Sequence, residues 1–259
     1  MRLGGFGNIK DYDHMRNAGF DYAELDLPEL EAMPEYDFRV FCSKVYDNQF
    51  PVLTGARAIP VMEPWFFTDT FQITAYRGYL EQACRRAEQI GMRKLIFGNG
   101  KARRLLYEDS MKKEKNFLDF MRMFAEIAGE SGQDVILEPL GPQYTNYINT
   151  LPEAVRIIRE VNMPNLFAMV DLRHMFWAEE PFEDIEAFAA FVRHVHMDYP
   201  RSYPQRLFPK PTDDYDYAPF LEAVKRSGYD DTLTIEADVP EDWESACQDV
   251  IKVSSLFFN

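Results

Sequence analysis

The strongest constraint on the fold is a regular alternation between short apolar segments and longer segments with helical spacing. The short segments, such as 94–97 and 232–236, are rich in aliphatic and β-branched residues and are bounded by turn residues, which is typical of buried strands. The longer segments, such as 73–90 and 112–129, are amphipathic and close at a glycine. This alternation predicts parallel strand–helix–strand units.

Eight such units fit within the chain of 259 residues. That number in this length favours a closed α/β barrel, a single (β/α)8 TIM barrel, over an open doubly wound sheet, because such barrels use about 250 residues as one domain. We therefore expect one domain over residues 1–259. The expected strands are 1–7, 22–27, 51–59, 94–97, 135–140, 168–171, 192–196 and 232–236. The expected helices are 12–18, 29–46 with a break near Pro34, 73–90, 112–129, 152–161, 182–191, 217–226 and 243–257.

The last four predicted strands each deliver a metal-ligand type of side chain at their carboxyl end. These residues are Glu138, Asp171, His196 and Glu236. A carboxylate at the end of a buried strand is costly unless something pairs with it. In a barrel the carboxyl ends of all strands converge on one mouth, so the four side chains can meet around one ion. The pattern predicts a metal site.

Three carboxylates and one imidazole form an oxygen-rich ligand set for one divalent cation. Manganese is favoured, and magnesium, cobalt or zinc are also compatible with these ligands. A cation with open positions can polarise a carbonyl and stabilise an enediolate after a proton leaves the adjacent carbon. Glu138 and Glu236 come from the fifth and eighth strands and would face each other across a substrate. We expect them to exchange protons with it as catalytic residues.

For other polar side chains near strand ends, the sequence gives weaker evidence of a functional role. His174 follows Asp171 by three residues, where a loop is expected to begin, and we expect it to contact substrate. His194 shares a strand face with His196 and is expected to be a core histidine or one that supports a ligand. Glu63 is expected to be a solvated loop carboxylate.

A loop after the third strand carries several aromatic residues. Trp65 is a candidate substrate contact, since an aromatic ring can pack against an apolar face of a small molecule. Packing at the barrel end and contact with another subunit are the alternatives for Trp65 and its neighbours. A substrate phosphate would require Arg103, Arg104 or Lys210 to reach the mouth, and each of them is otherwise a solvated loop cation.

Composition narrows the classes of partner. The net charge of −15 argues against nucleic acid, because phosphate binding relies on a basic surface. No segment reaches the roughly 18 apolar residues of a membrane span, and the chain opens without a signal-like segment, so no membrane partner is expected. Three widely spaced cysteines suit reduced thiols. These features predict a cytoplasmic protein.

Four segments resemble motifs of the xylose isomerase-like barrel superfamily, in particular its sugar isomerase and epimerase branch, which includes the ketose 3-epimerases. The resemblance covers nearly the whole chain. The segments are Leu137-Glu-Pro-Leu140 with Thr145-Asn146, Asp171-Leu-Arg-His174, His194-Val-His196 and Thr234-Ile-Glu236.

This resemblance implies that the four strand-end residues bind one divalent metal and that Glu138 and Glu236 move protons. It also implies that His174 and an arginine after the seventh strand bind substrate hydroxyls. Arg201 is the nearest candidate for that arginine, and Arg206 competes with it. The glycines of 98–100 followed by Arg103 resemble a substrate-binding loop of the family.

The chain departs from the ketose 3-epimerase pattern at Tyr144, where those enzymes usually have a second glutamate that contacts substrate. The substrate therefore stays open among a ketohexose, an aldose, an inositol-type ketone and a sugar glycoside. A lyase or dehydratase acting on such a small molecule is one alternative function. A sugar-binding subunit without turnover is another, and assembly into a homo-oligomer is compatible with all of them.

Overall fold

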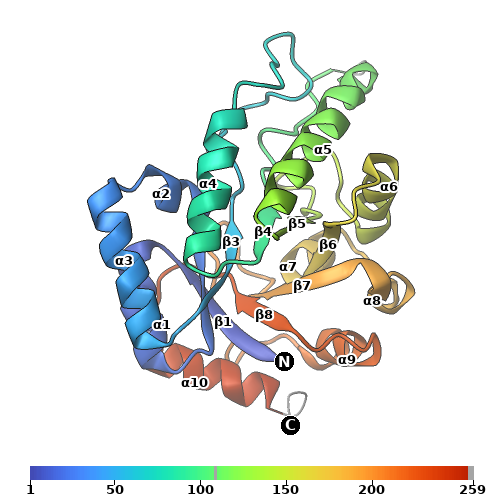
Figure 1. The fold of residues 1–259 in the computed structure, drawn as a ribbon. Helices are drawn as coiled ribbons and strands as arrows, with labels where there is room; N and C mark the ends of the chain where they lie inside the picture. The colour runs from blue at the N-terminus through green and yellow to red at the C-terminus, as the bar shows by residue number, and fades with distance from the viewer. Residues whose placement is uncertain (108–109, 256–259) are drawn as a thin grey trace.

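The computed structural model describes residues 1–107 and 110–255, and its strands close into one parallel barrel (Figure 1). The first strand pairs with both the second and the last, which confirms the expected (β/α)8 TIM barrel. The strands are β1 (Arg2–Gly7), β2 (Tyr22–Asp26), β3 (Val52–Ala56), β4 (Lys94–Phe97), β5 (Asp134–Leu137), β6 (Leu166–Asp171), β7 (Val192–Met197) and β8 (Thr232–Ile235).

Helices surround the strands, with their apolar faces turned towards the barrel (Figure 1). The α-helices are α1 (Tyr12–Ala18), α2 (Leu27–Ala32), α3 (Glu35–Asn48), α4 (Arg77–Gln89), α5 (Glu114–Glu130), α6 (Leu151–Val161), α7 (Leu172–Trp177), α8 (Glu183–Ala187), α9 (Ala218–Arg226) and α10 (Trp243–Ser254). Short 3-10 helices are η1 (Ile9–Asp11), η2 (Ser110–Lys113) and η3 (Ala189–Phe191). No helix among the described residues is long and apolar enough to cross a membrane.

The helix boundaries differ from expectation where local chemistry interrupts the pattern. The expected break at Pro34 is confirmed, since this proline stands at the start of α3 and separates it from α2. The segment 182–191 forms α8 and η3 instead of one helix. Residues 172–177 form a short helix in place of the expected loop, with the Asp171 side chain accepting from the His174 N–H. The expected end of the last helix, Phe257, lies outside the described residues.

The barrel interior is divided into an apolar half and a polar half. The apolar half lies along β4–β6 and forms a cluster separate from the large core beneath the helices. Its members are Ile96, Ile136 and Met169. The polar half comes from β2, β3, β7 and β8. Its fully buried members include Glu24, Thr54, His194 and Thr234.

Strand alternation carries this interior up to the mouth. Since successive side chains of a strand point to opposite faces, the residue two places beyond an inward side chain also points inward. The pairs related in this way are Ile136 with Glu138, Met169 with Asp171, His194 with His196, and Thr234 with Glu236. In the β6–β7 register Asp171 lies beside His196, and in the β7–β8 register His196 lies beside Thr234. The barrel geometry therefore brings the four strand ends into one layer.

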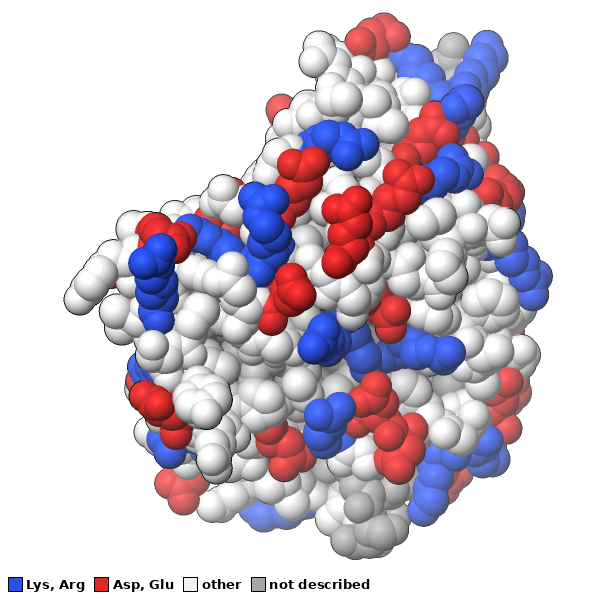
Figure 2. Space-filling view, viewed as in Figure 1, with Lys and Arg blue, Asp and Glu red and all other residues white. Residues whose placement is uncertain are grey.

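The amino end of the barrel is closed by charge pairing. The Lys94 ammonium lies 2.6 Å from Asp231 Oδ2 and 2.7 Å from Thr232 Oγ1. On the face of the molecule that Figure 2 shows, basic and acidic side chains are interspersed, without one continuous basic surface.

Glu180 makes the stability of the fold depend on pH. Its buried carboxylate accepts a hydrogen bond of 2.7 Å from the Leu151 N–H at the start of α6. Burial raises its pKa to about 8, although the bond from Leu151 opposes that shift. In the unfolded chain this pKa has its ordinary value, so between pH 4.5 and 8 the folded state holds a proton that the unfolded state lacks. This contribution to stability is present at acidic pH and is lost as pH rises through that window.

We expect Glu180→Gln to flatten this dependence, since glutamine keeps the acceptor for Leu151 and cannot ionise. Urea denaturation at pH 6 and pH 9 measures the free energy of unfolding of both proteins. From pH 6 to pH 9, the free energy of unfolding of the natural chain should fall by about 2 kcal/mol more than that of the variant. Parallel pH profiles for the two proteins would contradict this assignment.

Candidate metal centre

The structure brings the four predicted ligands together at the mouth of the barrel. One ligand atom from each of Glu138, Asp171, His196 and Glu236 lies within 4.8 Å of each of the others. Glu138, Asp171 and His196 are buried, and Glu236 is partly exposed. The strands β5–β8 supply these side chains from adjacent positions of the barrel wall.

The His196 ring lies at the centre of this cluster. Its Nδ1 atom is 3.2 Å from Glu236 Oε2, 3.6 Å from Glu138 Oε1 and 3.7 Å from Asp171 Oδ2. Within the described part of the chain, His196 Nδ1 and Glu138 Oε1 are buried and make no hydrogen bond. Buried polar atoms without partners are costly, and a cation among them would satisfy both. The donor set of three carboxylates and one imidazole therefore fits a divalent metal ion.

The carboxylates respond differently to their shared burial. Burial, with the neighbouring Glu236 and Asp171 charges, raises the pKa of Glu138 to about 7, although His196 opposes this shift. Burial also acts on Asp171, but the neighbouring His174, His196 and Arg206 side chains outweigh it and lower its pKa. The pKa of Glu236 is likewise lowered, mainly by Arg206. The cluster thus concentrates negative charge that a bound cation would compensate.

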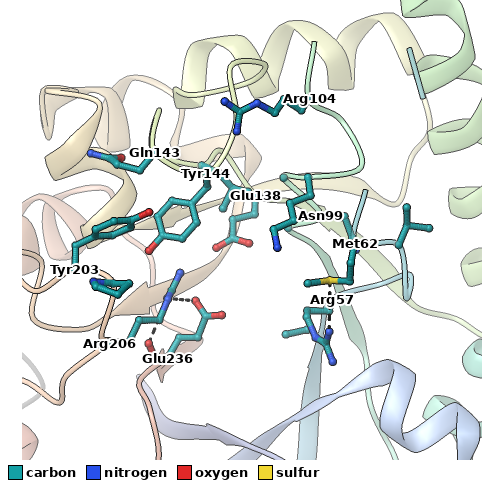
Figure 3. Close-up of a pocket in the computed structure, with 17 residues that line it drawn as sticks. Arg57, Met62, Asn99, Arg104, Glu138, Gln143, Tyr144, Tyr203, Arg206 and Glu236 are labelled. Atoms are coloured by element: carbon teal, nitrogen blue, oxygen red, sulfur yellow. Dashed lines mark hydrogen bonds and ion pairs between the residues drawn. The ribbon is translucent and has the colours of Figure 1, made fainter. Parts of the chain in front are cut away.

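A cavity of about 400 Å³ opens above the cluster (Figure 3). Glu138 and Glu236 line it, whereas Asp171 and His196 lie beneath its floor and are almost fully buried. In Figure 3 the carboxylates of Glu138 and Glu236 approach the same space from two sides. A cavity of this size accommodates a small-molecule ligand.

His174 and Arg206 lie beside the clustered ligands. Among the described residues, Arg206 lines the cavity, whereas the buried His174, a predicted substrate contact, does not. His174 Nε2 lies 3.5 Å from Glu138 Oε1, and Arg206 Nη2 lies 3.3 Å from the same nitrogen. Arg206 Nη1 also donates to the Glu236 carboxylate. Arg206 therefore takes the place predicted for Arg201, which lies at the surface and pairs with Asp214 at 2.8 Å.

The fully buried Arg173 explains where the loop after β7 runs. Its guanidinium donates to Asp198 Oδ2 at 2.6 Å and to the backbone carbonyls of Tyr199 and Gln205 at 3.1 and 3.2 Å. It also donates to the Ser202 carbonyl. These bonds fold the loop back over the barrel, which brings Arg206 to the cavity and leaves Arg201 outside.

Two other predicted substrate contacts are not among the described residues that line the cavity. Trp65 packs in an aromatic cluster, with ring centroids 4.8–5.7 Å from those of Phe66, Phe71, Tyr76 and Phe120. Arg103 is fully buried and donates to the backbone carbonyl of Glu138 at 2.6 Å. Trp65 therefore occupies the barrel-end packing position, and Arg103 supports the chain beside a candidate ligand.

The cations considered for a phosphate divide between two places. Arg104 lines the cavity (Figure 3), and Lys101 is also among the residues that line it. Lys210 lines a separate surface hollow with Asp238 and Asp242. Glu63 is exposed, as expected for a solvated loop carboxylate.

Two residues in or near the site have signals that the sequence reading passed over. Glu24 is fully buried in β2 and lies 2.9 Å from His196 and 3.0 Å from His194. The alternation of 22–27 would have placed Glu24 on the same strand face as Tyr22, pointing into the barrel. Tyr144, noted only as a departure, lines the cavity and packs edge-on against His174 with centroids 4.9 Å apart.

Comparison with known proteins identifies the family of this barrel. Residues 12–254 match the family model described as xylose isomerase-like TIM barrel. A 115-residue stretch is 32% identical to a ketose 3-epimerase from Arthrobacter globiformis and covers 44% of this chain and 38% of that relative. The match thus spans well under half of the curated relative.

Solved structures resemble the chain over its whole length. A D-psicose 3-epimerase crystallised in the presence of D-fructose has a TM-score of 0.82 at 15% identity, covering 100% of this chain and 99% of that one. The IolI protein with a bound zinc atom has a TM-score of 0.74 at 22% identity, with full coverage of both chains. At these identities the likeness establishes the shared barrel.

Proposed function

Since the chain belongs to the xylose isomerase-like TIM barrel family, we propose that it is a divalent-metal-dependent epimerase or isomerase of a sugar or sugar derivative. The curated relative is a ketose 3-epimerase, and a solved neighbour is a sugar 3-epimerase. The proposed substrate has a carbonyl next to a carbon that bears both a hydrogen and a hydroxyl.

One observation carries this proposal: of the four clustered ligands, the two glutamates alone line the cavity. Glu138 follows β5 and Glu236 follows β8, so their carboxylates approach bound substrate from different sides. A carboxylate on each side of one carbon is the arrangement that epimerisation needs. One group removes the proton and the other returns a proton to the opposite face.

The surrounding side chains hold the glutamates in place. Arg206 donates to the Glu236 carboxylate, and Arg103 fixes the backbone at Glu138 through its carbonyl. His174 is buried behind Arg206, with its Nε2 atom 3.3 Å from Arg206 Nη2 and 3.5 Å from Glu138 Oε1. Leu140 and Met62 add apolar wall to the cavity, which reduces water around the reacting carbon.

A divalent cation held by Glu138, Asp171, His196 and Glu236 would supply Lewis-acid stabilisation of the charge on the substrate's enediolate oxygens. Manganese, magnesium, cobalt and zinc all accept this ligand set, and we propose manganese as the working ion. A solved neighbour contains zinc. The protein's part is to orient the substrate and to move the proton.

Exchange of substrate protons with deuterated water tests this proposal. The protein, first stripped with a chelator, is incubated with D-fructose or L-ribulose in deuterated buffer, with and without Mn²⁺. Proton NMR should show that the signal of the hydrogen on the carbon next to the carbonyl disappears only when Mn²⁺ is present.

The products then separate the related activities. A changed configuration at that carbon identifies an epimerase, a moved carbonyl identifies an isomerase, and a lost hydroxyl identifies a lyase or dehydratase. Binding of these sugars without any exchange would favour a binding subunit and would count against the proposal.

A further inference from the structure

A buried carboxylate lies directly beneath the candidate metal centre. We propose that Glu24 is a positioning residue, which holds the His196 ring so that its Nδ1 lone pair points at the cation. This inference rests on the metal centre of the proposed function. It goes beyond that function because Glu24 touches neither the cavity nor the carboxylates that line it.

The two nitrogens of the His196 ring face opposite environments. Nε2 lies 2.9 Å from Glu24 Oε1, deep in the barrel, and Nδ1 faces Glu138, Asp171 and Glu236. Both His196 and Glu24 are fully buried. The ring therefore bridges a lower carboxylate and an upper carboxylate cluster.

This bridge selects one tautomer of His196. Nε2 and Glu24 Oε1 form a 2.9 Å ion-pair contact that is not aligned as a hydrogen bond. Since an ionised carboxylate can only accept from a proton-bearing donor, we infer that the nitrogen facing Glu24 carries the ring proton. In a neutral imidazole the other nitrogen then holds a free lone pair, and here that nitrogen is Nδ1. A carboxylate behind a ligating histidine also fixes the ring orientation and increases the basicity of the ligand.

Glu24 is itself held rigidly by the polar half of the barrel interior. Its Oε2 atom accepts from Thr54 Oγ1 at 2.6 Å and from Thr234 Oγ1 at 3.0 Å. His194 Nε2 lies 3.0 Å from the same oxygen, and His194 Nδ1 lies 2.8 Å from Thr232 Oγ1. With Oε2 occupied in this way, Oε1 is the oxygen left for His196.

The same contacts argue against a second ion among Glu24, His194 and His196, although their ligand atoms lie close enough for one. Two threonine hydroxyls already donate to Glu24, and both His194 nitrogens have polar partners. We therefore expect one ion per chain, with its histidine contact through Nδ1 of His196.

Calorimetric titration with Mn²⁺ of the full-length, chelator-stripped protein tests the proposal. Glu24→Gln should bind Mn²⁺ about 10- to 100-fold more weakly, because a neutral amide orients the ring less firmly. Glu24→Asp, which keeps the charge, should recover part of the affinity. Thr54→Val, which removes one support of Glu24, should cost less than Glu24→Gln. Circular dichroism melting of each metal-free variant establishes that it is folded.

A spectroscopic readout separates positioning from general damage. In the Zn²⁺-loaded protein with ¹⁵N-labelled histidine, His196 should be protonated at Nε2 and coordinated at Nδ1. The Nε2 proton should shift upfield in Glu24→Gln, because an amide oxygen accepts a weaker hydrogen bond than a carboxylate.

Each outcome bears on a different claim. A natural chain that binds no Mn²⁺ would remove the metal centre of the proposed function and this inference with it. Equal Mn²⁺ affinities of the natural chain and Glu24→Gln would overturn this inference and leave the metal centre of the proposed function standing. Two ions per chain, or coordination through Nε2 of His196, would also overturn it.

Discussion

Replacing Glu236 with glutamine is expected to abolish proton exchange with substrate while leaving the barrel folded. The amide keeps the size of the side chain and an oxygen that can accept from Arg206, but it cannot take up a proton from carbon. Loss of a general base at this position should lower the exchange rate about 10³-fold or more. The measurement is deuterium incorporation into sugar at saturating Mn²⁺.

Glu241→Gln is the matched control for this experiment. Glu241 is exposed on the loop between β8 and α10 and is not among the described residues that line the cavity. Its exchange rate should equal that of the natural chain, and both variants should unfold cooperatively in urea. Undiminished exchange by Glu236→Gln would remove Glu236 from the mechanism.

Gly98→Ala is expected to disable the same centre by displacing a ligand. Gly98 follows β4 directly, and a Cβ atom added there would lie 1.9 Å from Glu138 Oε2 and 3.1 Å from Glu138 Cδ. The Glu138 carboxylate must move out of that contact and so away from its place near His196. A ligand and proton carrier displaced by about 1 Å should cost roughly 10²-fold in exchange rate. Mn²⁺ affinity, measured by calorimetry, should fall with it.

Gly78→Ala provides the comparison for this glycine. Gly78 lies in the first turn of α4, and an added Cβ would meet no atom within 4 Å. Alanine also has the higher helix propensity, so this variant should bind Mn²⁺ normally and be at least as stable as the natural chain. Normal Mn²⁺ binding by Gly98→Ala as well would show that the carboxylate at Glu138 relaxes without loss.

The fold and the four clustered side chains were predictable because both depend on short-range patterns. Strand and helix spacing define the eight units, and the convergence of strand ends follows from barrel closure. Each of the four ligands lies within one residue of the end of its strand: Glu138, Asp171, His196 and Glu236. Their clustering could therefore be predicted without knowing how the loops fold.

The cavity wall was not predictable in the same way, because loops fold by contacts between distant residues. Arg201 was the nearer candidate by spacing, yet the hydrogen bonds of Arg173 fold the loop so that Arg206 reaches Glu236. For Trp65 the residue type left substrate contact, barrel-end packing and a subunit contact open. Its aromatic partners come from α5 and from the loop before α4, and no local sequence pattern predicts these contacts.

Glu24 was overlooked for a different reason. A charged residue within an alternating strand is ordinarily assigned to solvent, and the polar half of the barrel interior reverses that assignment. The reversal depends on His194, His196 and two threonines from three other strands. The alternation of 22–27 places Glu24 on the face of Tyr22, but the residues that make this face part of a polar interior lie on the other strands.

Because one side of the barrel interior is apolar and the other is polar, natural substitutions on the two sides should have different effects. Ile96, Ile136 and Met169 form the buried aliphatic filling along β4–β6, so trimming them should yield chains that unfold early or accumulate poorly in cells. Changes on the opposite side alter hydrogen bonds around Glu24 and should yield well-folded but impaired proteins. A survey of natural variants could thus separate abundance defects from chemical defects by which strand the substitution occupies.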